Sequence, residues 1–97
     1  MHVRISVIEG DPGKIDGAVS VLNEKVIPTL KGVSGFTAAN FMADRSTGEL
    51  VGVAFWSDEA ALAASAEAVN PIRSAVADAL DGKVTSVKSY ELVAQSW

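Results

Sequence analysis

Four side chains in the sequence belong to types that bind small aromatic molecules. Trp56 ends an apolar run and precedes an alanine-rich stretch, so its ring either packs in the core or forms one wall of a pocket beside the small alanines. Asn40, Arg73 and Tyr90 are the polar groups that such a pocket could use to bind and orient a phenolic ligand. These four residues are the candidate substrate-binding set.

Each of the four also has an ordinary structural interpretation. Large aromatic residues such as Trp56 usually anchor protein interiors, and a buried asparagine usually satisfies a structural hydrogen bond. An arginine on a helical stripe, as Arg73 is, usually reaches toward solvent or pairs with an acid. Tyr90 fits equally well as a half-buried packing residue. The sequence alone leaves both interpretations open.

Several kinds of chemistry are excluded or lose support. The chain has no cysteine, which excludes disulfides, zinc–thiolate sites and thiol nucleophiles. Its single histidine is His2, so histidine-rich metal sites and Ser-His-Asp triads have little support. No glycine-rich phosphate loop is present. We therefore expect no metal and no cofactor.

Composition and charge limit the class of protein. The 97 residues are 48% hydrophobic, which predicts one domain over residues 1–97 with a real core. Twelve acids outweigh eight scattered bases, so nucleic acid and acidic membrane surfaces are poor partners. No signal peptide and no long apolar span is apparent. We expect a cytoplasmic protein.

Hydrophobic periodicity predicts six main elements. Period-two patterns indicate strands, and apolar residues at steps of three and four indicate helices. Pro28 should kink or tighten the first helix, and Asn70–Pro71 should interrupt the second. A shift in apolar phase indicates a bulge in the last strand. The predicted elements are a strand at 2–10, a helix at 11–32, a hairpin of strands at 36–43 and 49–56, a helix at 57–81 and a strand at 83–95.

This order predicts a ferredoxin-like βαββαβ protomer of the α+β class, with a four-stranded antiparallel sheet and both helices on one face. Both side-chain rows of the strand at 49–56 are apolar, so the second sheet face also needs cover. Another copy of the same sheet is the simplest cover, which predicts a homodimer. We expect Trp97, at the chain end, to contact the partner subunit.

The position of Asn40 depends on the hairpin register. Pairing with Gly52 would place it on the same face as Trp56, and pairing with Val53 would place it on the other face.

The stretch "VIPTLKGVSGFTAANFMADRSTGELVGVAFWSDEAALAAS" resembles the dimeric α+β barrel proteins, and in particular their antibiotic-biosynthesis-monooxygenase-like branch. The resemblance is carried by Pro28, by Gly-Phe at 35–36, by Thr-Gly at 47–48 and by Trp-Ser-Asp-Glu at 56–59. In the order of its elements, the resemblance covers nearly the whole chain.

The resemblance implies a homodimer of sheets packed face to face. It also implies a cofactor-independent monooxygenase, or a related enzyme, that acts on a small phenolic metabolite bound between sheet and helices. In that interpretation Trp56 is the aromatic wall. The alternative is a non-catalytic homodimeric binding or accessory module, because the polar partners that polyketide oxygenases of this branch carry beside the tryptophan are replaced here by Gly52 and Ala54.

Overall fold

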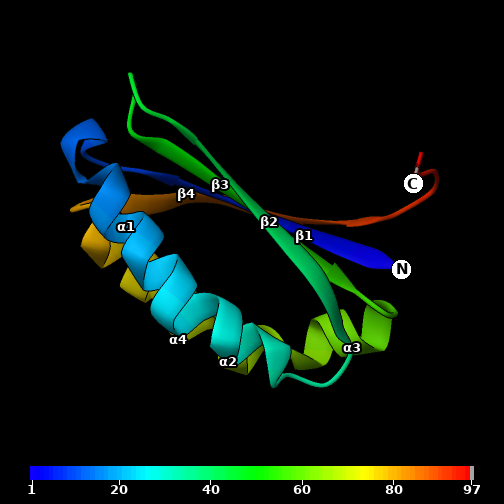
Figure 1. Ribbon diagram of the computed structural model, residues 1–97. Helices are drawn as coiled ribbons and strands as arrows, with labels where there is room; N and C mark the ends of the chain where they lie inside the picture. The colour runs from blue at the N-terminus through cyan, green and yellow to red at the C-terminus, as the bar shows by residue number, and fades with distance from the viewer. Residues whose placement is uncertain (97) are drawn as a thin grey trace.

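The computed structural model describes residues 1–96, and the contact predicted for Trp97 lies outside them (Figure 1). The predicted order of a strand, a helix, two strands, a helix and a strand is confirmed, with each helical region built from shorter pieces. The elements are β1 (His2–Glu9), a 3-10 turn η1 (Pro12–Lys14), α1 (Ile15–Val21), a π turn η2 (Leu22–Val26), α2 (Ile27–Lys31), β2 (Phe36–Asp44), β3 (Glu49–Trp56), α3 (Glu59–Ala64), α4 (Ala66–Ala79) and β4 (Lys83–Glu91).

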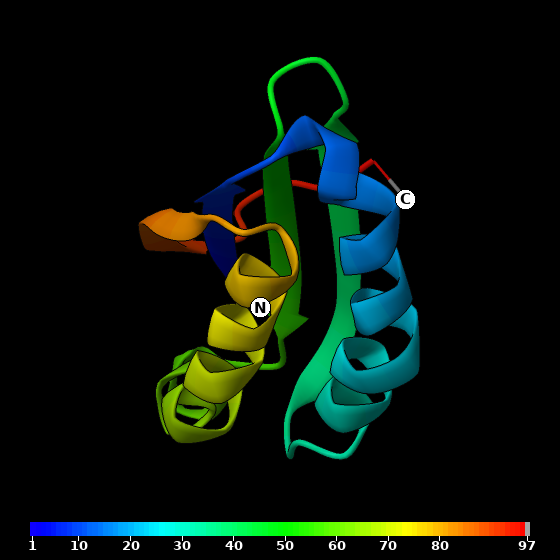
Figure 2. The ribbon, with the colours of Figure 1, turned by 90° about the vertical axis from the view of Figure 1, so that its left-hand side faces the viewer.

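The four strands form one antiparallel sheet in the order β2-β3-β1-β4. All the helices lie against one face of it, which confirms the ferredoxin-like α+β arrangement (Figures 1 and 2). We call this the helix face; on β1 its residues are His2, Arg4, Ser6 and Ile8. The other side is the open face; on β1 its residues are Val3, Ile5 and Val7.

The open face is apolar along the two central strands. Val3, Ile5 and Val7 pair with Phe55, Val53 and Val51 across the β1–β3 ladder. Val3 and Phe55 are buried, and the other four side chains are partly exposed. The helix face of β3 is also apolar, since it carries Trp56 and Leu50. Both rows of β3 are therefore apolar, as the sequence predicts.

The hairpin register settles the position of Asn40. A bulge between Phe36 and Ala38 shifts the β2–β3 ladder, so that Asn40 pairs with Val53. Asn40 therefore lies on the open face, opposite to the face that carries Trp56. The predicted bulge in the last strand is also present, between Val7 and Ile8 on the β1–β4 ladder.

The first helical region widens before Pro28. The N–H of Ile27 donates to the carbonyl of Leu22, which is the long-range bond of a π turn. The predicted tightening at Pro28 is thus wrong, because the helix is wider just before the proline; the kink predicted as its alternative stays a prediction. Since Pro28 has no N–H to donate, the regular bonding pattern cannot continue through it.

The second helical region is interrupted at Ser65, between α3 and α4, and the predicted interruption at Asn70–Pro71 is wrong. Pro71 lies inside α4. Its missing N–H leaves the carbonyl of Glu67 without a helical partner. Both Pro71 and Glu67 are exposed, so water can hydrate that carbonyl and the helix continues.

The break at Ser65 has a tertiary cause. An unbroken helix would need the carbonyl of Leu62 to accept from the N–H of Ala66. That carbonyl accepts from Arg4 Nη2 at 2.8 Å and from Ser65 Oγ at 2.6 Å. A strand residue thus determines where the helix is interrupted.

The main core lies between the helix face and the helices. Its largest members are fully buried, and they come from β3, the start of α1 and the end of α4. The core as a whole, to which β1, η2, α2 and α3 also contribute, includes Ile8, Ile15, Leu22, Val26, Leu30, Leu50, Trp56, Leu62, Val76 and Leu80.

The last strand is shorter than predicted. It ends at Glu91, and residues 92–96 follow without strand structure, tied back by the N–H of Leu92 to the carbonyl of Met1. None of the helices described for residues 1–96 has the length and apolar character needed to cross a membrane.

We expect Gly48→Ala to destabilise the fold. Gly48 has φ of 82°, and a Cβ there would lie 2.0 Å from the carbonyl oxygen of Gly10. The left-handed backbone alone should cost about 1–3 kcal/mol of the free energy of unfolding. Urea unfolding monitored by circular dichroism measures this. Gly17→Ala is the matched control, because a Cβ at Gly17 meets nothing within 4 Å and alanine favours helix. Equal stability of both variants would contradict the argument.

Candidate functional site

A cleft lies between the helix face and the helices, with a free volume of about 50 Å³. Its walls are mostly apolar, with side chains from β1, β2 and β3 on one side and from η2, α2 and α4 on the other. The polar groups that reach it are Arg4, Ser6 and Arg73. These three residues, with their apolar surroundings, are the candidate site.

The strand register determines which residues form the floor of the cleft. Ser6, Gly52 and Phe41 lie side by side across β1, β3 and β2. Gly52 has no side chain, and the ring of Phe41 lies over it: a Cβ on Gly52 would approach Phe41 Cε1 to 2.9 Å. The absence of a side chain at Gly52 therefore leaves space in the sheet floor, and the Phe41 ring partly covers it.

Arg73 reaches the cleft from α4 and is half-buried. Its Nε donates to Ser6 Oγ at 3.1 Å, and its Nη1 donates to Asn70 Oδ1 at 2.8 Å. The first bond joins α4 to β1 across the cleft, and the second holds the guanidinium along its own helix. Both acceptors are neutral.

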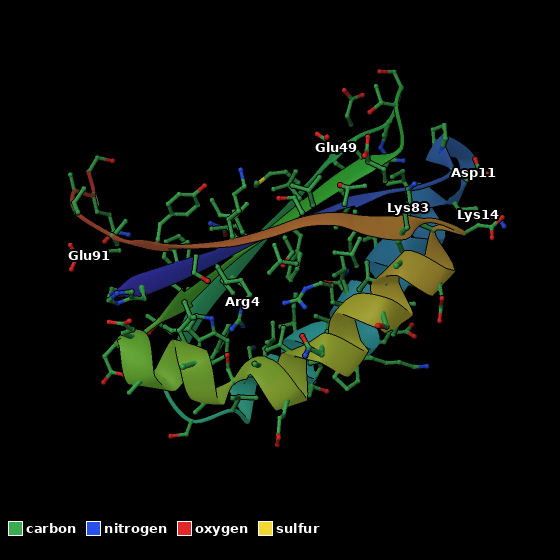
Figure 3. The ribbon with its side chains drawn as sticks, turned by 180° about the vertical axis from the view of Figure 1, so that it is seen from behind. Arg4, Asp11, Lys14, Glu49, Lys83 and Glu91 are labelled. Carbon is green, nitrogen blue, oxygen red and sulfur yellow. The ribbon has the colours of Figure 1, made fainter. Side chains whose placement is uncertain are left out.

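Arg4 reaches the cleft from β1 and is only 6% exposed. Its Nη1 donates to Ser65 Oγ at 2.9 Å, and its Nη2 donates to the carbonyl of Leu62 at 2.8 Å. Its guanidinium carbon also lies 5.9 Å from the ring centroid of Trp56, within cation–π range. Figure 3 shows Arg4 between the sheet and the helices.

Burial and mutual repulsion act on both guanidiniums. Burial lowers the pKa of Arg4, and the positive charge of Arg73 lowers that pKa further. Burial also lowers the pKa of Arg73. Arginine starts from so high a pKa that both side chains stay protonated near neutral pH. The cleft therefore carries two positive charges.

Trp56 is fully buried beneath Arg4 and is not among the residues that line the cleft. Its ring meets Phe36 edge to face, with centroids 5.5 Å apart. Its Nε1 has no hydrogen-bond partner among the described residues. Trp56 therefore packs in the core, where it supports Arg4.

The four candidate residues from the sequence are not brought together. Arg73 lines the cleft and Trp56 lies behind it. Asn40 and Tyr90 lie on the open face, on the outer strands β2 and β4, and Tyr90 is half exposed. No cluster of three or more His, Asp or Glu side chains that could hold a metal occurs among the residues described.

Sequence reasoning missed Arg4 and Ser6. The β1 pattern has an apolar row and a polar row, and the polar row would normally face solvent. Here the polar row faces the helices. The residues of β3 could have indicated this. Gly52 and Ala54 lie in the same row as Trp56, and they pair with Ser6 and Arg4 respectively. Small residues on a core-facing row leave room for polar neighbours.

No protein-family model matches the chain. The uncharacterized protein Rv2557 of Mycobacterium tuberculosis is 28% identical over 94 residues, which are 97% of this chain and 42% of that protein. The chain thus spans about two fifths of the length of that relative.

Solved structures show the same fold. SnoaB, a cofactor-independent oxygenase from Streptomyces nogalater, has 13% identity and a TM-score of 0.69, covering 97% of this chain and 94% of that one. The monooxygenase from the gene ActVA-Orf6 of Streptomyces coelicolor, in complex with Nanaomycin D, has 21% identity and a TM-score of 0.68, covering 99% and 88%. The chain has the fold of the antibiotic-biosynthesis-monooxygenase-like proteins, which confirms the predicted resemblance at the level of fold.

We expect Trp56→Phe to cost about 1–3 kcal/mol of the free energy of unfolding, the usual scale for a core shape change. The loss should fall at the lower end, because the change also removes an indole N–H that has no partner. Urea titration measures it. Trp56→Ala should cost more, since it leaves a cavity. Unchanged stability in both variants would show that Trp56 is not a core residue.

Proposed function

We propose that the cleft binds a small electron-rich aromatic metabolite and that the chain is a cofactor-independent monooxygenase acting on it. The observation that carries the proposal is the cleft: apolar walls surround a polar patch in which Arg73 and Ser6 meet at 3.1 Å. SnoaB, which has the same fold, is a cofactor-independent oxygenase.

The chemistry requires little from the protein. An ionised phenol or enol can itself give an electron to dioxygen, so the protein needs only to bind the anion, orient it and exclude water. For a methylene group the reaction balances as R₂CH₂ + O₂ → R₂C=O + H₂O, with no external reductant. Arg73 would hold the ionised oxygen, and the apolar side chains of Phe41 and Ile72 would contact the ring.

One observation favours a second candidate. No Asp, Glu, His or Tyr lines the cleft within the described part of the chain, so no proton acceptor stands beside a bound substrate. A substrate would have to enter already ionised or lose its proton to water. The second candidate is therefore a non-catalytic small-molecule-binding or accessory module with the same fold.

The same proposal includes a homodimer formed through the open face. The six apolar side chains of β1 and β3 on that face have no cover from the helices, and exposed apolar patches of this kind typically mark interfaces. Asn40 and Tyr90 would then lie at the edges of the interface, where their polar atoms remain hydrated.

We expect the protein to consume dissolved oxygen with a single-ring, quinol-like phenol, without added metal, flavin or haem, at a rate that a chelator does not change. An oxygen electrode measures this. Gly52→Ala should lower the rate several-fold, because the added Cβ pushes the Phe41 ring. Gly17→Ala is the control and should keep the rate. Ligand-induced thermal stabilisation without oxygen uptake would favour the binding module; neither response across a panel of phenols would exclude the oxygenase and make the accessory module the first candidate.

We expect sedimentation equilibrium at micromolar protein to give twice the 10.1 kDa chain mass. Val53→Lys should produce unfolded or aggregated chain, since a buried unpaired charge costs on the order of 3–5 kcal/mol. Ser74→Lys, on the exposed side of α4, is the matched control and should leave the dimer intact. A well-folded monomer at this concentration would contradict the dimer.

A further inference from the structure

We propose that the ligand of the cleft is a monocyclic organic anion, an aromatic carboxylate or a ring phenolate stable at neutral pH, whose negative charge is shared by Arg4 and Arg73. This inference rests on the proposed function in one respect, namely that the cleft is the ligand site. It adds the charge of the ligand, its approximate size, and a role for Arg4.

Both arginines have neutral hydrogen-bond partners. Arg4 donates to a serine hydroxyl and a main-chain carbonyl, and Arg73 donates to a serine hydroxyl and an asparagine amide. A guanidinium carries several N–H donors, so these bonds do not use all of them. These bonds use some of the N–H donors, but none of the acceptors balances the positive charge.

The paired carboxylates of residues 1–96 lie away from the two arginines. Within residues 1–96 the ion pairs join Lys14 to Asp81 and Arg45 to Asp16, His2 Nε2 lies 4.0 Å from Glu59, and none of these contacts includes Arg4 or Arg73. In Figure 3 the labelled acids Asp11, Glu49 and Glu91 lie at the ends of the strands, well away from Arg4.

Two guanidinium charges without a counter-charge are costly in these surroundings. Buried charges in proteins are normally paired, because a low-dielectric surrounding disfavours an isolated ion. Here two like charges lie close enough for Arg73 to lower the pKa of Arg4, beside apolar walls. The chain has a net charge of −4, yet its acids are not placed here. An anion from outside the chain would supply the missing counter-charge.

The volume of the cleft limits the size of its ligand. The free volume of about 50 Å³ is below the roughly 150 Å³ of an engineered cavity that accepts benzene. One ring can therefore enter only if a side chain moves, and Phe41, which lies over Gly52, is placed to do so. A fused polycyclic ligand would need several walls to move at once. The cleft therefore favours a single ring with its charge toward the two guanidiniums.

The experiment compares two ligands of the same shape by isothermal titration calorimetry. Benzoate is the anionic probe and benzamide is its neutral counterpart. We expect benzoate to bind at least tenfold more tightly than benzamide, and the difference to shrink as sodium chloride is raised. Arg73→Met should remove at least tenfold of the benzoate affinity and leave benzamide unchanged, whereas Arg73→Lys should keep part of it.

Arg4→Met should have the same selective effect if it folds, which circular dichroism checks; Arg73→Met carries the test if it does not. Arg45→Met is the matched control, because that exposed arginine pairs with Asp16 far from the cleft, and it should leave both affinities unchanged.

Three results would overturn the inference. If both probes bind equally, or if Arg73→Met weakens both alike, the ligand is not selected by charge, and the proposed ligand cleft still stands. If neither probe binds at millimolar concentration, this inference fails, and the panel of phenols tests the ligand cleft separately. Conversely, selective benzoate binding without oxygen uptake from any phenol would leave this inference intact and remove the proposed oxygenase activity.

Discussion

The buried guanidinium of Arg4 is the contact on which the helix side of the molecule depends. One side chain bonds the junction of α3 and α4 to the central strand β1, lies over the ring of Trp56 and forms part of the cleft wall. Hydrogen bonds to a charged group typically contribute about 1.5–3 kcal/mol each, and more when burial excludes water. The same contact therefore holds the helix break, the tryptophan and the site in one arrangement.

The elements of the fold could be predicted because their signals are local. Period-two apolar residues mark β1 and β3, and Asp58, whose Oδ1 accepts from the N–H of Ala61, begins α3 as an N-cap should. The break between α3 and α4 could not be predicted in this way. Its cause is a bond between residues 61 positions apart, Arg4 and Ser65, and no window along the sequence contains both. The local signal at Pro71 was stronger and led to the wrong position.

The candidate site was predictable only in part. Arg73 was identified because a charge interrupts an apolar helical stripe. Arg4 was not, because an alternating strand pattern separates two faces without showing which one the helices cover. The position of Asn40 depended on a single bulge near Thr37, which shifts the ladder by one residue and leaves no mark in the composition of β2. The identity of each side chain can be read from the sequence, but the face of the sheet on which it lies depends on how the strands pair.

The alternation of β1 has a consequence for how this protein can change over evolutionary time. Its even-numbered positions hold the two cleft residues Arg4 and Ser6, and its odd-numbered positions hold the apolar residues of the open face. Gaining or losing one residue within the strand, between Ser6 and Ile8, would exchange the two sets in its first half, placing Val3 and Ile5 on the helix face and the Arg4 guanidinium on the opposite surface. The edge strand β4 accommodates an extra residue as a bulge, but β1 is paired on both sides. Descendants of this chain should therefore diversify the site by substitution and keep the length of β1 constant.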